Sequence, residues 1–392
     1  MHVNLDRHQQ QLLLSDVKLH HLTHLTDYLQ NIQSPRNNPL EQNSFFHPIS
    51  GFYISSTDVI LRHILFDLSG TFSSPPPYSA YHRAGPRKHI YFQPSQVQAA
   101  IVTCGGLCPG LNTVIRELVM VLWDLYGVRQ IFGIKAGYRG FYSYEPIQLN
   151  PKMVHHLHRR GGTFLQTSRG GFHLQRIVDS IQNSGFNQVY IIGGVGTMRG
   201  ALAIFEEIKR SKLNIAVAGI PKTVDNDVGI IDRSFGFQTA VEMVQQSISA
   251  AHLEAESAVN GIGLVKLMGR STGHIAVYAT RRGLFEFLEG RLKENNHAVV
   301  VVAEGAGQDL IPPPPISSTS VSEGEAQEEE KKKMDESGNL VFLDIGGWLK
   351  SELNKWWARD HPKEELFTVK YIDPTYMIRA VAANVLVKFA QM

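Results

Sequence analysis

Short apolar runs alternate along the chain with longer segments in which apolar residues recur at helical spacing. Several short runs are rich in β-branched residues and stop at glycine or proline, which is typical of buried strands that lead into turns. In the longer segments apolar residues such as Val114, Leu118 and Val121 share one helical face. Alternating strands and helices predict an α/β protein with mainly parallel sheets. The predicted strands are 99–103, 131–134, 188–192, 215–220, 261–268, 297–303 and 367–372, and the predicted helices are 111–126, 198–208, 237–254, 284–292 and 341–357.

Two polar loops follow neighbouring strands of this pattern. The strand 188–192 leads into a glycine-rich turn and a helix, and the strand 215–220 leads into a loop with Lys222 and Asp225. Because the carboxyl ends of parallel strands meet at one edge of a sheet, we expect both loops on the same edge. Backbone N–H groups of a glycine-rich turn can approach phosphate oxygens, and an Asp opposite them can accept a proton from a hydroxyl. The pair favours phosphoryl transfer, although the glycines alone are equally compatible with an ordinary turn.

The composition is typical of a soluble globular protein, with 43% hydrophobic and 19% charged residues. A chain of 392 residues can hold two domains of ordinary size. The net charge of +2 implies no general attraction to nucleic acid or to an anionic membrane. No apolar stretch reaches the roughly 18 residues that a membrane span needs, and the N-terminal region does not resemble a leader peptide. These features predict a cytoplasmic protein.

Neither the cysteines nor a histidine cluster is expected to hold a metal. Cys104 and Cys108 are too few for a thiolate metal site or a disulfide framework, so they are predicted to be reduced packing residues. His20, His21 and His24 are close in sequence but lack an accompanying carboxylate or thiol framework. A solvated weak helix is the favoured interpretation of that segment.

The two polar loops and four further motifs carry a resemblance to a known family. GGVGT at residues 193–197 resembles the GGDGT loop of phosphofructokinases, and PKTVDND at residues 221–227 resembles their catalytic loop. The resemblance extends from about residue 36 to residue 383 and is greatest to the plant ATP-dependent 6-phosphofructokinases. The further motifs are Thr103-Cys104-Gly105-Gly106-Leu107-Cys108-Pro109-Gly110, Arg169-Gly170-Gly171, Met268-Gly269-Arg270 and Tyr376-Met377-Ile378-Arg379.

The resemblance implies a reaction and a fold. Family members transfer the γ-phosphoryl group of ATP to the 1-hydroxyl of fructose 6-phosphate, which gives fructose 1,6-bisphosphate in glycolysis. The implied fold has two three-layer α/β/α domains with mainly parallel sheets and the active site in the cleft between them. We expect an N-terminal extension and arm over 1–88, a nucleotide-binding domain over 89–235, and an incomplete sugar-phosphate domain over 236–392 with a mobile loop at 311–338.

The resemblance also implies a role for each motif. Asp225 matches the family's catalytic base. Thr223 and Asp227 match residues that orient the sugar and the metal-bound phosphates, and Lys222 supplies positive charge. The implied nucleotide site is Gly106, Arg169, Gly170, Gly194, Val195, Gly196 and Thr197, and the implied substrate site is Thr223, Val224, Asp225, Met268, Gly269, Arg270, Tyr376, Met377, Ile378 and Arg379.

Two residues of the GGVGT loop bear on the metal and on the phosphoryl donor. Val195 occupies the position of a family Asp that serves Mg²⁺ and the phosphates. Because magnesium prefers oxygen ligands and an isopropyl group supplies none, Val195 predicts weaker metal binding and impaired activity. Relatives that use pyrophosphate resemble this chain at Lys222 but carry a carboxylate at the Gly196 position. Glycine there favours ATP as the donor.

One strand of the expected pattern is absent from the sequence. A helical pattern ends near Thr280, and the residues 281–283 lead directly into the next helix, although an alternating pattern predicts a strand between them. Family members carry here a segment with a strand and a Glu that contacts the sugar. They also continue beyond the apolar stretch in which this sequence stops. We therefore expect an internal segment and the C-terminal part of the second domain to be missing.

Several alternatives stay open at this stage. Val195 and the absent strand also fit a catalytically impaired subunit that binds sugar phosphate or tunes active relatives. A pyrophosphate-dependent phosphofructokinase, an incomplete or decayed sequence, and a kinase acting on lipids or NAD are further alternatives. The resemblance implies a homo-oligomer or a hetero-oligomer with relatives, and allosteric control.

Overall fold

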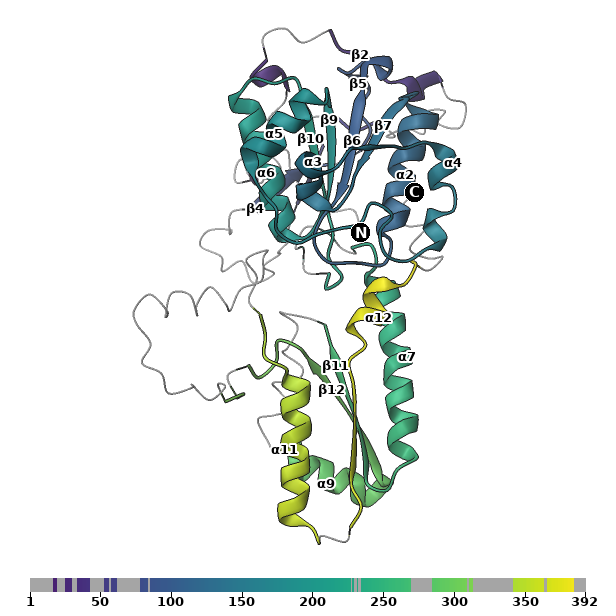
Figure 1. The fold of residues 1–392 in the computed structure, drawn as a ribbon, viewed down its shortest axis with the longest axis vertical. Helices are drawn as coiled ribbons and strands as arrows, with labels where there is room; N and C mark the ends of the chain where they lie inside the picture. Colours follow the sequence, from purple (N-terminus) through teal and green to yellow (C-terminus); the bar gives the residue numbers. More distant parts are fainter. Residues whose placement is uncertain are drawn as a thin grey trace, which may run out of the picture.

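The computed structural model of the chain has two α/β lobes that lie one above the other along the long axis of the molecule (Figure 1). The first lobe begins after β5 (His89–Ile90), and the second begins at α7 (Phe237–Glu256). The structure describes residues 17–19, 25–29, 34–42, 53–55, 58–61, 78–83, 85–226, 228, 231, 234–268, 284–308, 310–312, 341–362 and 365–383.

A five-stranded sheet forms the centre of the first lobe. Its order is β10-β9-β6-β7-β8, and every neighbouring pair is parallel except β7 with β8. The central strand β6 is buried along most of its length, which explains the continuous apolar run in its sequence. The strands are β6 (Gln98–Thr103), β7 (Gln130–Ile134), β8 (Ile147–Gln148), β9 (Gln188–Gly193) and β10 (Ala216–Pro221).

Helices cover both faces of this sheet. Ile177 and Ile204 belong to the core on one face, and Leu111 and Ile115 belong to the core on the other. The lobe therefore has the three layers that an α/β protein with a parallel sheet requires. The helices are α2 (Leu111–Met120), which continues as a π-helical turn (Val121–Leu125), α3 (Gly140–Ser143), α4 (Pro151–Val154), α5 (Leu174–Asn183) and α6 (Val195–Arg210).

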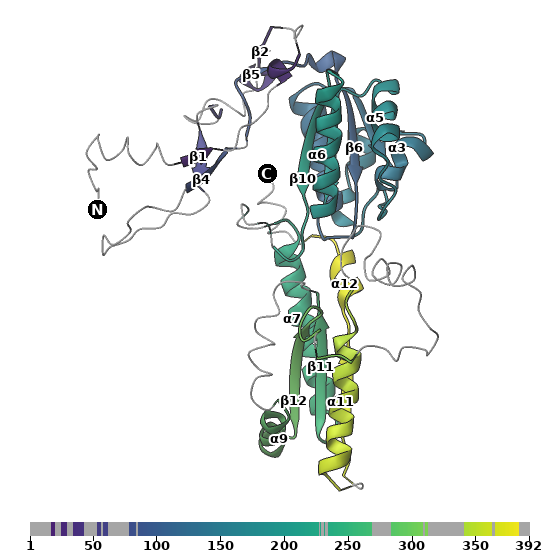
Figure 2. The same cartoon turned by 90° about the vertical axis from the view of Figure 1, so that its left-hand side faces the viewer.

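A three-stranded parallel sheet of order β12-β11-β13 forms the second lobe. The helix α7 packs closely on β11, because Gly261 and Gly263 lack side chains where the backbone oxygens of Ala255 and Ala251 approach. The helices α9 and α11 bury their apolar residues on the other face (Figure 2). The elements are α7 (Phe237–Glu256), β11 (Gly261–Leu267), α9 (Leu284–Asn295), β12 (His297–Ala303), α11 (Ile345–Asp360), β13 (Thr368–Ile372) and α12 (Thr375–Ala380).

The N-terminal region adds two small sheets beside the first lobe. Their orders are β1-β4-β3 and β2-β5. The strands are β1 (Val17–Leu19), β2 (Arg36–Asn37), β3 (Val59–Leu61), β4 (Tyr78–His82) and β5 (His89–Ile90). The short 3-10 helices among the described residues are η1 (Leu25–Asp27), η2 (Pro39–Gln42), η4 (Pro94–Gln96), η6 (Gly137–Arg139) and η7 (Leu157–Arg159).

The structure confirms the predicted α/β class and each predicted strand to within one residue at either end. The helix predicted at 341–357 is wrong at its start, because α11 begins only at Ile345. Cys104 and Cys108 are free and buried, as predicted. The predicted absence of a strand before residue 284, the loop predicted at 311–338 (apart from Ile311 and Pro312), and the histidines at 20, 21 and 24 lie outside the described residues. The predicted domain boundaries stay predictions.

No helix in the described part of the chain is both long and apolar enough to cross a membrane.

Candidate functional site

The carboxyl ends of β6, β9 and β10 form one edge of the first sheet. Because β9 lies between its two neighbours, Ile192 pairs with Thr103 on one side and with Ile220 on the other. The turn after Thr103, the glycine-rich turn after β9 and the loop after Pro221 therefore start next to one another. The two polar loops share an edge of the sheet, as predicted.

The glycine-rich turn has little room for side chains. A Cβ atom on Gly193 would overlap the side chain of Thr197, so the strand can turn this tightly into α6 only at a glycine. The backbone N–H of Lys222 donates to the oxygen of Gly193 at 2.8 Å, which ties this turn to the neighbouring loop. Gly194 caps α6, and Val195 is its first residue with 58% of its surface exposed.

A pocket of about 300 Å³ lies directly against this turn. Two arginines line it, Arg169 from the loop before α5 and Arg199 from the second turn of α6. The start of a helix and two guanidinium groups together favour an anionic ligand. The lining residues are Cys104, Gly105, Tyr138, Ser168, Arg169, Gly170, Phe172, Gly196, Thr197, Arg199 and Gly200.

Two arginine side chains lie against Gly106, and a lysine lies close enough for their charges to act on it. A Cβ atom on Gly106 would overlap Nη2 of Arg379 and would lie 3.6 Å from Nη2 of Arg169. The third cation is Lys222, whose pKa is lowered by burial and further by the charges of Arg379 and Arg169, while Asp225 opposes this effect. A partly buried lysine beside two arginines has its charge stabilised by an incoming anion. The arrangement fits a phosphate group.

The loop after β10 is held by its own polar side chains. Oγ1 of Thr223 accepts a hydrogen bond from the backbone N–H of Asp225 at 3.1 Å. The Ser234 hydroxyl donates to the backbone oxygen of Thr223 at 2.7 Å, and its N–H donates to Oδ1 of Asn226 at 2.7 Å. Asp225 is half-buried on this loop. Its carboxylate is thereby placed close to the cationic cluster, whereas Asp227 lies outside the described residues.

The second lobe reaches this site through α12. Nε of Arg379 donates to the backbone oxygen of Leu107 at 3.4 Å, so the two lobes meet at the turn after β6. Tyr376 and Met377 are exposed, and the side chain of Ile378 is fully buried, so that only its backbone could face a ligand. Met268 is half-buried just beyond β11, and the neighbouring Gly269 and Arg270 lie outside the described residues.

The described residues do not supply the ligands that magnesium prefers. They contain no group of three or more His, Cys, Asp or Glu side chains that could hold a metal ion. Val195 presents an apolar side chain where the family resemblance requires a carboxylate, and Asp225 is the acidic residue of the adjoining loop that the structure describes. We therefore derive no catalytic step through a metal.

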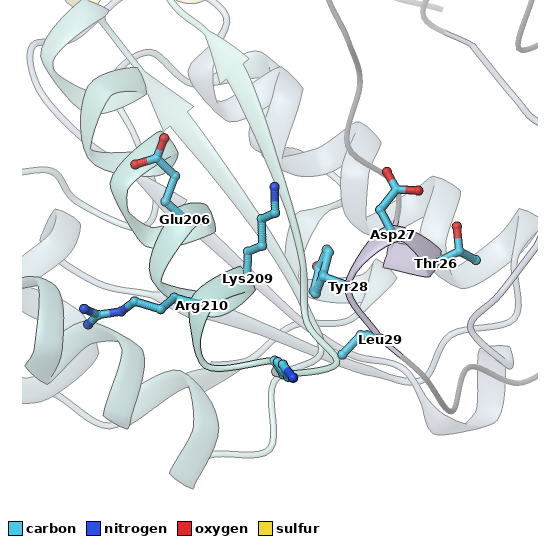
Figure 3. A pocket seen from close by; sticks show the side chains of 8 residues that line it. Thr26, Asp27, Tyr28, Leu29, Glu206, Lys209 and Arg210 are labelled. Carbon is cyan, nitrogen blue, oxygen red and sulfur yellow. The ribbon is translucent and has the colours of Figure 1, made fainter.

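A larger hollow of about 570 Å³ lies elsewhere, at the C-terminal end of α6. Figure 3 shows Glu206 and Lys209 of α6 on one side of it and Asp27 and Tyr28 on the other. Arg210 pairs with Glu207 at 2.5 Å, and the carboxyl end of a helix disfavours anions. Nothing in the part of the chain that the structure describes assigns a ligand to this hollow.

Sequence reasoning missed two residues of the site. Tyr138 is buried beneath α6 and donates its hydroxyl to the backbone oxygen of Thr197 at 2.7 Å. Arg199 lines the pocket from one helical turn beyond Gly196. The spacing from Gly196 to Arg199 is a signal in the sequence, because residues three apart lie on the same helical face.

The fold and the site together define a class of two-lobed α/β proteins with a cationic pocket at the carboxyl ends of parallel strands. Residues 98–342 match the phosphofructokinase family model. The chain is 63% identical over 369 residues to ATP-dependent 6-phosphofructokinase 2 of Arabidopsis thaliana, covering 89% of this chain and 79% of that protein. It is also 44% identical to ATP-dependent 6-phosphofructokinase of Borreliella burgdorferi, covering 77% of this chain and 70% of that protein. The chain belongs to the phosphofructokinase family.

Solved structures agree with this fold. Pyrophosphate-dependent phosphofructokinase from Nitrosospira multiformis matches 76% of this chain and 74% of its own with a TM-score of 0.55 at 16% identity. Phosphofructokinase from Saccharomyces cerevisiae matches 75% of this chain and 40% of its own with a TM-score of 0.52 at 18% identity. Identities this low establish the fold alone.

Proposed function

We propose that this chain catalyses the ATP-dependent phosphorylation of fructose 6-phosphate to fructose 1,6-bisphosphate in glycolysis. The observation that carries the proposal is the pair Arg169 and Arg379 at Gly106, with the charges of Lys222 and of Asp225, on the adjoining loop, close by. The identity of 63% to a protein named as an ATP-dependent enzyme supports ATP over pyrophosphate as the donor.

Each part of the cluster has a task in this reaction. Asp225 accepts the proton of the attacking sugar hydroxyl, and the cations stabilise negative charge on the transferring oxygens. The site lies where the two lobes meet, so that ATP from the first lobe and the sugar from the second can be aligned. Glycine at position 196 leaves the start of α6 open to a nucleotide phosphate.

Val195 favours a second candidate, a catalytically impaired subunit that still binds the sugar phosphate. Its exposed isopropyl group supplies no oxygen to Mg²⁺ at the start of α6. The proposal accordingly includes Mg²⁺ as the ion that accompanies ATP but assigns it weak binding at this loop. We further propose that the protein is cytoplasmic and forms an oligomer, either from copies of this chain or together with related chains.

A donor-exchange assay tests the proposal. Formation of fructose 1,6-bisphosphate is measured with fructose 6-phosphate and either ATP or pyrophosphate, and fructose 6-phosphate binding is measured by calorimetry. We expect turnover with ATP, and a loss of about 100-fold or more in Asp225→Asn. Asp179→Asn, an exposed Asp on α5, is the matched control. Turnover with pyrophosphate but not with ATP overturns ATP as the donor. Binding of fructose 6-phosphate without turnover establishes the impaired subunit. A protein that neither binds the sugar phosphate nor turns it over overturns both candidate functions.

A further inference from the structure

A half-buried lysine joins three segments at the carboxyl end of the second sheet. Lys266 lies near the end of the central strand β11, and only 16% of its side chain is exposed. Its Nζ lies 2.8 Å from Oδ2 of Asp373, which follows β13. The same Nζ lies 3.6 Å from Oδ1 of Asp344, which precedes α11. The ammonium group therefore links β11 to the end of β13 and to the start of α11.

The second oxygen of Asp373 starts the next helix. Oδ1 accepts hydrogen bonds from the backbone N–H of Thr375 at 3.1 Å and from its hydroxyl at 2.5 Å. Thr375 is the first residue of α12. One carboxylate thus binds the lysine with one oxygen and holds the first turn of α12 with the other.

The charges of this network are stabilised despite partial burial. Burial disfavours the charged form of Lys266, but the hydrogen bond and charge of Asp373 outweigh it and raise the pKa of the lysine. Burial likewise opposes ionisation of Asp373, whereas the hydrogen bonds from Lys266 and Thr375 lower its pKa. Apolar residues of similar size often stabilise a fold as well as an ion pair does. An ion pair with fixed partners has the further effect of holding the segments that carry the two charges in one position.

The position that matters is that of Arg379. It lies on α12 one helical turn after Thr375, beside the fully buried Ile378 that anchors the helix. Its guanidinium reaches across the cleft to the backbone oxygen of Leu107. A shift in the start of this six-residue helix would carry Arg379 with it.

We infer that Lys266 is a positioning residue for sugar-phosphate binding: through Asp373 it fixes the start of α12 and thereby places Arg379 at the cleft. The inference rests on the proposed function, because it assumes that the ligand of the second lobe is a sugar phosphate. We expect nucleotide binding to depend much less on this network, because the pocket at the start of α6 is lined by residues of the first lobe and by none of α12.

Calorimetry with fructose 6-phosphate and, separately, with ATP tests the inference. We expect Lys266→Met to weaken binding of fructose 6-phosphate about tenfold and to leave the affinity for ATP within about twofold. Lys266→Arg, which keeps the charge, should restore most of the affinity. Lys370→Met is the matched control, since Lys370 lies on β13 and pairs with Glu254 on the exposed surface.

Asp373→Asn tests the same ion pair from its other partner, with the same two calorimetric measurements. Asn keeps an oxygen that can accept a hydrogen bond from Thr375 but loses the charge that binds Lys266. If Lys266→Met fails to fold, the affinity of Asp373→Asn for fructose 6-phosphate tests the inference in its place. Unchanged affinity for fructose 6-phosphate in a folded variant overturns the inference, and so does an equal loss for both ligands, which indicates general destabilisation. Wild-type protein that binds no fructose 6-phosphate overturns the proposed function, and the inference fails with it.

Discussion

Arg379 and Leu107 lie 272 residues apart in the sequence, and the guanidinium Nε donates to the backbone oxygen of Leu107 at 3.4 Å. This hydrogen bond joins α12 of the second lobe to the turn after β6 in the first. The approach is possible because the preceding residue is Gly106, where any side chain would occupy the place of the guanidinium. The turn after β6 is thus a point of contact between the two lobes.

Gly106→Ala should displace Arg379 and weaken sugar-phosphate binding. The added methyl group would overlap Nη2 of Arg379, and because this is the far end of a flexible side chain, the arginine should move while the backbone stays. We expect fructose 6-phosphate to bind about tenfold more weakly, with a change of less than about 1 kcal/mol in the free energy of unfolding. Calorimetry measures the affinity, and denaturant unfolding measures the free energy of unfolding.

The control for this substitution is Gly290→Ala. Gly290 lies in α9, and a Cβ atom there would meet nothing within 4 Å. The variant should bind the sugar phosphate normally and gain about 0.5–1 kcal/mol in stability, because alanine favours a helix over glycine. Equal affinity for fructose 6-phosphate in Gly106→Ala and Gly290→Ala would contradict the placement of Arg379 at the sugar-phosphate site.

Tyr138→Phe should loosen the first turn of α6. The substitution removes the hydroxyl that donates to the backbone oxygen of Thr197 and leaves the ring in its buried place. We expect a loss of about 0.5–1.5 kcal/mol in stability and a rise of a few fold in KM for ATP at constant KM for the sugar. Tyr190→Phe removes a hydroxyl that bonds Gln188 within β9, so it should leave KM for ATP unchanged. A rise in KM for ATP in both variants would show that the effect comes from the sheet and not from the first turn of α6.

The strands and their polar loops were predictable because local signals mark them. Glycine or proline stands where β9 and β10 end, and parallel strands place their carboxyl ends together whatever the rest of the fold does. The resemblance then gave a role to Arg379, but the spacing of residues could not place it beside Gly106. That neighbourhood depends on how the two lobes meet.

The wrong start of the helix predicted at 341–357 has a tertiary cause. Val341 and Leu343 fit a helical pattern, yet both are exposed and precede α11. The side chain of Gln308 bonds both the N–H and the oxygen of Leu343, at 2.8 Å and 3.1 Å, and so holds this residue outside the helix. A partner so distant in sequence leaves no local signal. Tyr138 and Lys266 were missed for the same reason.

Lys222→Met should stabilise the protein in the absence of ligands and abolish phosphate binding. Burial lowers the pKa of Lys222 in the folded state, so folding a charged lysine is unfavourable at every pH below that pKa. Above the ordinary lysine pKa of about 10.4 both states are neutral, and the cost disappears. The variant should therefore gain about 0.5–2 kcal/mol at pH 7 and less at pH 10.

Denaturant unfolding at the two pH values, with and without inorganic phosphate, measures this effect. Phosphate should stabilise the wild-type protein but not Lys222→Met, since binding to the folded state alone raises stability. Lys152→Met on α4 replaces an exposed lysine and should change neither quantity. A variant that is less stable than wild type at pH 7 without phosphate would show that the lysine charge is favourable in the fold.

Val195→Asp should raise turnover by about tenfold or more in the presence of Mg²⁺. The substitution places a carboxylate at the first residue of α6, where the family resemblance puts a ligand of the metal and phosphates. The helix start favours negative charge by about 0.3–1 kcal/mol, so the fold should not suffer. Val259→Asp is the control, because Val259 has the same exposed fraction, 58%, in a turn after α7. Coupled assays across a magnesium titration measure the effect, and an unchanged rate in a folded variant counts against this assignment of the glycine-rich loop.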